Sequence, residues 1–211
     1  MDATADKLND RTPDLPDDEH REKGTALLIV DMIGKFDHDD GEELFKNALP
    51  AADNISRLKE KAAAANIPVI YVNDNFGEWK HDFRATVDAA RASERGKQIL
   101  DLIEPGTDDY HVLKPQHSGF FSTPLDVLLA SLKVSRLIVT GGATDICILA
   151  TAHDAYMRGF EIIVPGDCTA AASNDQKNEA LDLLSRIVKA DIGPSTNIDL
   201  SNPLQNKGLA A

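Results

Sequence analysis

Short, continuous runs of aliphatic residues alternate with longer amphipathic segments along most of this chain. The runs cover residues 25–31 (TALLIVD), 67–73 (IPVIYVN), 110–114 (YHVLK), 136–142 (RLIVTGG) and 160–166 (FEIIVPG). Such runs, without polar alternation, are typical of strands that are buried on both faces of a parallel sheet. We therefore predict a strand at each of these five segments.

The segments between the runs have the apolar spacing of helices. Helical patterns cover residues 42–66, 84–103, 123–133, 144–158 and 174–189. We expect Pro50 to divide or restart the first helix and Gly159 to close the fourth. The alternation predicts an α/β fold of three layers, α/β/α, with helices on both faces of a parallel, doubly wound sheet. In such sheets ligands bind at the carboxyl ends of the strands.

Length and composition favour a single domain, which we assign to residues 25–211 of the 211. Residues 1–24 are charged and poor in large apolar groups, so we interpret them as a flexible acidic arm. The formal net charge of -13, without a dense Lys/Arg cluster, argues against nucleic acid or an acidic membrane as a partner. The N-terminus lacks the apolar core of a secretory signal, and we expect a cytoplasmic protein.

Three chemically reactive side chains follow the apolar parts of three different predicted strands: Asp31, Lys114 and Cys147. At the carboxyl edge of a parallel sheet they would share one crevice, where a cysteine thiolate can act as a nucleophile. Asp31 would accept the thiol proton, while Lys114 and the start of the following helix favour the thiolate. Each residue also has a structural interpretation: a turn cap, a solvated lysine and a small buried hydrophobe. The occurrence of all three at predicted strand ends favours a catalytic role.

The segment GGATDICILATAHDAYMRGFEIIVPGDCTAA, together with LLIVDM and VLKPQHSGFFSTPLDVLL, resembles the isochorismatase-like cysteine hydrolase family over residues 25–192. The resemblance implies a six-stranded parallel sheet and a catalytic triad at Asp31, Lys114 and Cys147. It also implies a cis peptide between Gly142 and Ala143, with the N–H groups of Ala143 and Cys147 as an oxyanion hole. The alternative for the glycine pair is a flexible strand end.

These features predict hydrolysis of a small amide, ureide or related C–N substrate through an acyl-thioester, without a cofactor. Two alternatives remain open at this point. The same triad would serve an isochorismatase-type C–O hydrolase acting on a vinyl ether or ester. A noncatalytic, oligomeric protein that binds a small ligand would also account for the pattern. The resemblance further implies a homo-oligomer, either a dimer or a tetramer.

Substrate contacts are expected from the loops that flank the triad segments. Nicotinamidases of this family have an Asp-x-His metal motif after the second strand, whereas this chain has Asp74, Asn75 and Phe76 there, so we predict no metal site. His81 alone is more typical of a surface histidine than of a ligand. Core packing is the alternative for the aromatic members of the predicted pocket wall, which comprises Phe36, Asn73, Trp79, Phe120 and Ile146.

Overall fold

A computed structural model describes residues 24–200 of the chain, and its centre is a six-stranded parallel sheet. The strands are β1 (Gly24–Val30), β2 (Val69–Asp74), β3 (Tyr110–Lys114), β4 (Val134–Gly142), β5 (Glu161–Ile163) and β6 (Thr169–Ala170). Their order is β3-β2-β1-β4-β5, and β6 pairs with β4 beyond the end of β5. The predicted doubly wound parallel sheet is confirmed.

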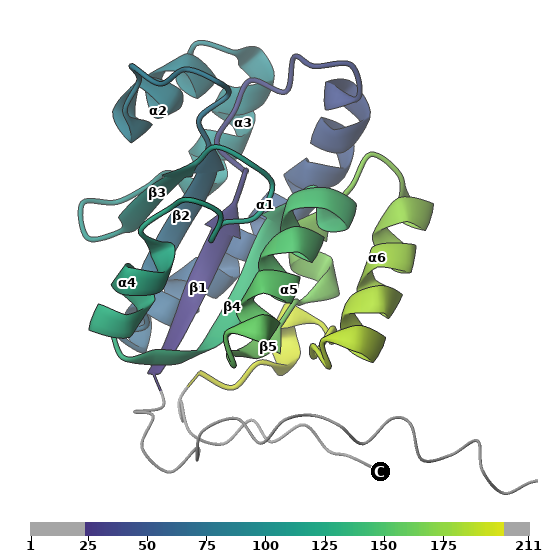
Figure 1. The fold of residues 1–211 in the computed structure, drawn as a ribbon. Helices are drawn as coiled ribbons and strands as arrows, with labels where there is room; N and C mark the ends of the chain where they lie inside the picture. The colour runs from purple at the N-terminus through teal and green to yellow at the C-terminus, as the bar shows by residue number, and fades with distance from the viewer. Residues whose placement is uncertain (1–23, 201–211) are drawn as a thin grey trace, which may run out of the picture.

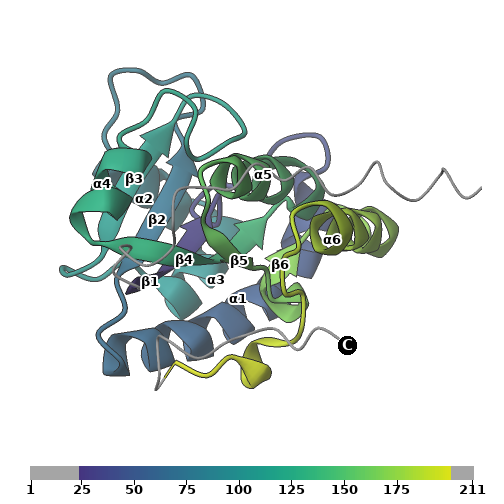
Figure 2. The ribbon, with the colours of Figure 1, turned by 60° about the horizontal axis from the view of Figure 1, so that its bottom comes forward.

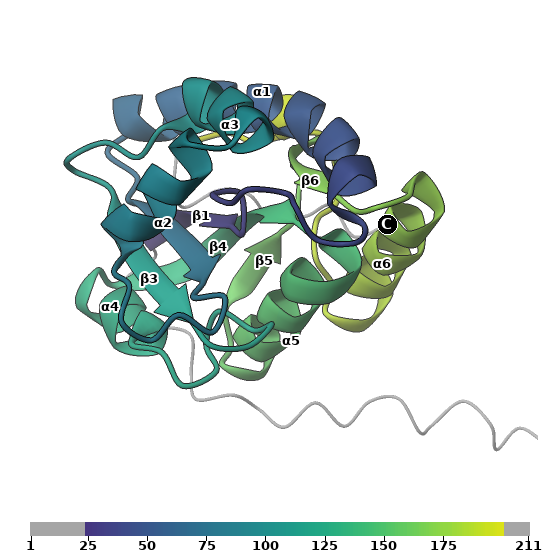
Figure 3. The same ribbon diagram turned by 90° about the horizontal axis from the view of Figure 1, so that it is seen from above.

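Helices cover both faces of this sheet, as expected for three layers. One face carries α1 (Gly41–Ala64) and α3 (Glu94–Ile103), and the other carries α4 (Leu125–Ser131), α5 (Leu149–Met157) and α6 (Asn174–Ile187) (Figure 2, Figure 3). The short helix α2 (Phe83–Arg91) packs on α3 near the carboxyl ends of β2 and β3 (Figure 1). Single turns are η2 (Thr144–Ile148), η3 (Gly166–Cys168) and η4 (Ser195–Asn197).

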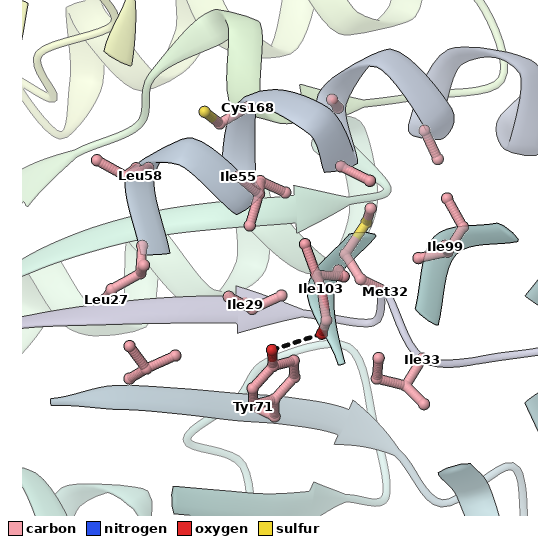
Figure 4. Packing of buried hydrophobic residues seen from close by; sticks show 14 of the residues in the cluster. Leu27, Ile29, Met32, Ile33, Ile55, Leu58, Tyr71, Ile99, Ile103 and Cys168 are labelled. Atoms are coloured by element: carbon pink, nitrogen blue, oxygen red, sulfur yellow. Dashed lines mark hydrogen bonds between the residues drawn. The ribbon is translucent and has the colours of Figure 1, made fainter. Parts of the chain in front are cut away.

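Alternation along the central strands divides the core into two layers. Leu27 and Ile29 of β1 pack with Ile55 of α1 on one face, whereas Leu28 and Val30 face α4, α5 and α6. Figure 4 shows the first layer, in which the Tyr71 hydroxyl donates to the carbonyl of Ile103 at 2.6 Å. Because both faces are buried, the strands read as continuous apolar runs.

Three predicted boundaries differ from the structure. Pro50 lies inside the 24-residue helix α1 and does not divide it. Its ring is exposed while its neighbours Ala51 and Ala52 are buried against the sheet, so packing maintains the helix despite the lost N–H. The segment 84–103 divides at Ser93, whose side chain accepts from the N–H of Gly96. The fourth predicted helix begins as the π-turn η2.

The predicted arm lies outside the described residues, apart from Gly24, which begins β1. Between residues 24 and 200, none of the helices combines the length and the apolar character that crossing a membrane requires.

Candidate active site

The carboxyl ends of β1, β3 and β4 bring the three predicted catalytic side chains into contact. Lys114 ends β3, two strands away from β1, and its side chain crosses the end of β2, where its register partner is Asp74. Its Nζ lies 2.8 Å from Asp31 Oδ2, 3.4 Å from Asp74 Oδ2 and 3.5 Å from Cys147 Sγ. The lysine is 0% exposed, so it is a buried cation shared by two carboxylates and a thiol.

Asp31 is held by the turn that leaves β1. Its backbone φ is 49°, a left-handed conformation that aspartate adopts more readily than most residues. Its N–H donates to the carbonyl of Val72, and its Oδ1 accepts the N–H of Asp74 at 2.6 Å. The carboxylate therefore has one oxygen fixed by backbone, leaving the other for Lys114 and the thiol.

Cys147 lies in η2, directly after β4. The peptide bond between Gly142 and Ala143 is cis, and the carbonyl of Ala143 accepts the N–H groups of Ile146 and Ile148, both at 3.1 Å. Gly141 has a φ of 114°, and a Cβ there would lie 2.0 Å from the carbonyl oxygen of Val30. Only glycine fits this close approach of β4 to β1, which sets the start of the turn that carries the thiol.

Burial controls the protonation of the triad. Burial, together with the charge of Asp31, raises the pKa of the Cys147 thiol to about 12, although Lys114 acts in the opposite direction. Burial also raises the pKa of Asp31, against the opposing charge of Lys114. Lys114 thus acts on the thiol in the direction that the sequence suggested, but burial and Asp31 outweigh its effect. The raised pKa favours a neutral thiol beside Asp31 at neutral pH.

Lys114 stays charged in this arrangement. Burial by itself lowers its pKa, but the negative charges of Asp31 and Asp74 and the hydrogen bond to Asp31 outweigh burial, so that the pKa is raised. A permanently charged ammonium beside a neutral thiol stabilises negative charge when it develops on sulfur.

A cavity of about 690 Å³ opens onto the triad. Asp31, Cys147, Gly142 and Ala143 line it, so the thiol and the cis peptide face the same space. Of the predicted wall residues, Phe36 and Ile146 also line the cavity. The remaining walls come from the loops after β1, β2 and β3, from the turn η2, from one face of α2, and from the first turns of α1 and α6.

The structure does not bring the other three predicted wall residues to this cavity. Asn73 is fully buried, and its side-chain amide binds the N–H and the carbonyl of Ile33 at 3.2 and 2.6 Å, so it fixes the loop after Asp31. Phe120 packs in the core against Phe160. Trp79 is 78% exposed and lies outside the lining. Position next to a triad segment did not specify the direction of these side chains.

Several cavity residues were not predicted as contacts. Asp74 was considered only as a metal ligand, yet it pairs with Lys114, a role that its register opposite Lys114 would have suggested. Asp145, two residues before Cys147, and His38, in the loop after β1, also line the cavity. Both residues follow a strand closely in the sequence, and this position could have suggested that they line the cavity.

The described part of the chain does not gather three His, Cys, Asp or Glu side chains into a metal-binding group. Asp74 Oδ1 instead accepts the N–H of Phe76 at 2.6 Å, and Phe76 stands where the Asp-x-His motif has its histidine. The donor set around Asp74 therefore does not fit the metal of nicotinamidases.

Fold, triad geometry and cavity define an isochorismatase-like hydrolase. The chain belongs to the isochorismatase family, because the isochorismatase domain matches residues 25–191. It is 42% identical over 167 residues to the isochorismatase family protein YaaI of Bacillus subtilis, across 79% of this chain and 92% of YaaI. It is 29% identical to ureidoacrylate amidohydrolase RutB of Serratia proteamaculans, across 70% of each chain.

Solved structures agree with this assignment. N-carbamoylsarcosine amidase from Thermoplasma acidophilum superimposes with a TM-score of 0.64 at 28% identity, over 83% of this chain and 99% of the amidase. The family around this chain therefore includes hydrolases of C–N bonds other than peptide bonds.

Proposed function

We propose that this protein hydrolyses a small amide or ureide through a covalent intermediate on Cys147. The observation that carries the proposal is the contact among Asp31, Lys114 and Cys147 at the cavity, in a chain whose relatives include amidohydrolases. A cavity of about 690 Å³ suits a small molecule rather than a protein chain.

The first half of the reaction forms a thioester. Asp31 takes the proton of the Cys147 thiol while sulfur attacks the carbonyl carbon of the substrate. The carbonyl oxygen becomes an oxyanion, for which the N–H groups of Ala143 and Cys147 are the expected donors. The C–N bond then breaks, Asp31 returns its proton to the leaving nitrogen, and the amine departs.

The second half regenerates the thiol. Asp31 removes a proton from water, and the hydroxide attacks the thioester carbonyl. The C–S bond breaks, the acid is released, and the proton held by Asp31 returns to sulfur. Lys114 stabilises each developing negative charge, which the high pKa of Cys147 makes necessary, because the resting thiol is neutral.

A panel of primary amides and ureides tests the proposal, with ammonia or amine release as the readout. We expect turnover by the native chain, a mass increase equal to the acyl group on Cys147 during turnover, and loss of at least about a thousandfold in kcat in Cys147→Ala. Cys168→Ala is the matched control and should retain activity. Turnover that persists in Cys147→Ala, or cleavage restricted to C–O esters and vinyl ethers, would contradict the proposal.

The homo-oligomer, the small-molecule partner and the cytoplasmic location stay predictions, as does the role of each triad residue.

A further inference from the structure

Four carboxylates that line the cavity have no ion-pair partner among the described residues. Asp37 and Asp40 come from the loop after β1, Glu78 from the loop after β2, and Asp145 from η2. Among residues 24–200 none of the four makes an ion pair or a side-chain hydrogen bond. Lys35 is the one lysine or arginine in the lining, so that wall is strongly negative when histidine is counted as neutral.

The buried cation Lys114 does not change the negative charge of the cavity wall. Lys114 is buried behind the cavity wall, where Asp31 and Asp74 already share its charge. A carboxylate on a substrate would therefore meet four negative charges and a single exposed lysine.

Asp145 has a carboxylate oxygen without a hydrogen-bond donor. It lies two residues before the nucleophile and lines the cavity, and its Oδ1 is buried without a hydrogen-bond partner. An acceptor that is buried without a donor is unfavourable, so a bound molecule that brings a donor to the Asp145 carboxylate is favoured. A protonated nitrogen is the strongest donor for a carboxylate.

An aromatic ring lies at the same cavity. Phe76 is 60% exposed, and its ring extends from the loop after β2 toward the loop after β1, within 3.5 Å of the place where a Cβ on Gly34 would lie. Exposed aromatic faces combined with carboxylates are a favourable environment for ammonium groups.

We propose that the cavity selects amides or ureides that carry a positively charged nitrogen and excludes those that carry a carboxylate. This inference rests on the proposed function and names its substrate class. Asp145 places a carboxylate two residues from the nucleophile, while Asp37, Asp40 and Glu78 supply the surrounding field. Hydrolysis creates a new carboxylate on the acyl product, which the same field would repel, so the lining also favours product release.

Three benzamides of nearly equal size test the inference: 4-(aminomethyl)benzamide, 4-methylbenzamide and 4-carbamoylbenzoate. We expect kcat/KM to fall in that order, with at least about a tenfold difference between the cation and the anion at low salt. Raising the salt concentration should reduce this ratio, because exposed charges are screened. An equal or reversed order would overturn the inference while leaving the proposed amidase function intact.

Two variants locate the effect. Asp145→Asn and Glu78→Gln should each reduce the ratio of cation to anion by about threefold or more, whereas Asp182→Asn, on the exposed side of α6 and outside the lining, should leave it unchanged. Glu78 is on an exposed loop, so its substitution tests the field even if Asp145→Asn fails to fold. A ratio that neither variant changes would contradict the inference.

Binding separates this inference from the proposed function. If the native chain turns over none of the three benzamides, calorimetry with Cys147→Ala measures the affinity for each of them. Tighter binding of the cation would support charge selection at this cavity although the amidase proposal had failed for this panel. Binding that is equal for cation and anion, or tighter for the anion, would overturn it.

Discussion

The two cysteines of the chain lie in different surroundings, and we propose that one is a reactive thiol and the other a structural one. Both are buried, and burial raises the pKa of each thiol to about 12. Cys147 lines the cavity, 3.5 Å from the ammonium of Lys114. Cys168 is 0% exposed and packs in the core near Ile55 and Leu58 of α1 (Figure 4). Thiol pKa alone therefore does not distinguish them.

The neighbouring charges make the difference. Each cysteine has a carboxylate beside it, but both oxygens of Asp167 accept from Ser195, at 2.8 Å from its N–H and 2.7 Å from its hydroxyl. Asp31 keeps one oxygen for Lys114 and the thiol. Burial lowers the pKa of Lys177 near Cys168, whereas carboxylates raise the pKa of Lys114. A nucleophile here needs an available base, a held cation and a path for substrate.

A large effect on both activity and stability is expected from loss of the cation beside Cys147. Lys114→Met should lower kcat/KM by at least about a hundredfold, because charge that develops on sulfur and oxygen loses its stabilising ammonium. It should also lower the free energy of unfolding by about 3 kcal/mol, since Asp31 and Asp74 lose a shared buried partner. Amide hydrolysis and urea unfolding measure the two quantities.

Lys177→Met provides the matched control beside the other cysteine. Its kcat/KM should stay within about twofold of the native value, since Lys177 does not line the cavity. Asp31→Asn adds a second test of the base if Lys114→Met does not fold, and it should abolish turnover. Full activity in either Asp31→Asn or Lys114→Met would remove the basis for treating the Cys147 environment as the reactive one.

A smaller but direct contrast concerns alkylation by iodoacetamide. Cys147 should react at least about a hundredfold faster than Cys168 in the folded protein, because the cavity admits the reagent only to Cys147. Since deprotonation requires a pH near 12, its rate should continue to rise with pH above about 8.5, where an ordinary thiol levels off. Peptide mass spectrometry over time measures both rates.

Urea-unfolded protein is the reference, in which the two cysteines should react alike. A plateau of the Cys147 rate near neutral pH would indicate a standing thiolate and contradict the protonation state described above. Equal labelling of Cys168 in the folded protein would show that the core near α1 opens as readily as the cavity.

Most of the fold could be predicted from the sequence because its strands are buried on both faces. Continuous apolar runs located five of the six strands, and β6, with two residues, is too short to leave a pattern. The helix interruption expected at Pro50 was wrong, since packing against the sheet outweighs a missing N–H on the exposed side. Helix propensity alone does not include the packing of α1 against the sheet.

The candidate site was predictable as far as strand ends determine it. Asp31, Lys114 and Cys147 meet because the carboxyl ends of parallel strands lie at one edge of the sheet. The position of each residue directly after a strand can be seen in the sequence. Side-chain direction in the loops was not predictable: Asn73 faces the loop after Asp31, and Trp79 faces solvent. The protonation of Cys147 also required structure, because it depends on burial and on distances between charges.

The smallest expected effect lies at the structural cysteine and tests whether its carboxylate is purely structural. Asp167→Asn replaces two charge-assisted bonds to Ser195 by neutral ones, with the amide nitrogen donating to the hydroxyl, so it should lower the free energy of unfolding by about 1–2 kcal/mol while amide hydrolysis stays unchanged. Ser195→Ala should cost a similar amount, and the double variant less than the sum, because the two share one interaction. Additive losses would mean that the pair does not act as a unit. Reduced kcat in Asp167→Asn would mean that the surroundings of Cys168 reach the chemistry, and the contrast between the two cysteines would then fail.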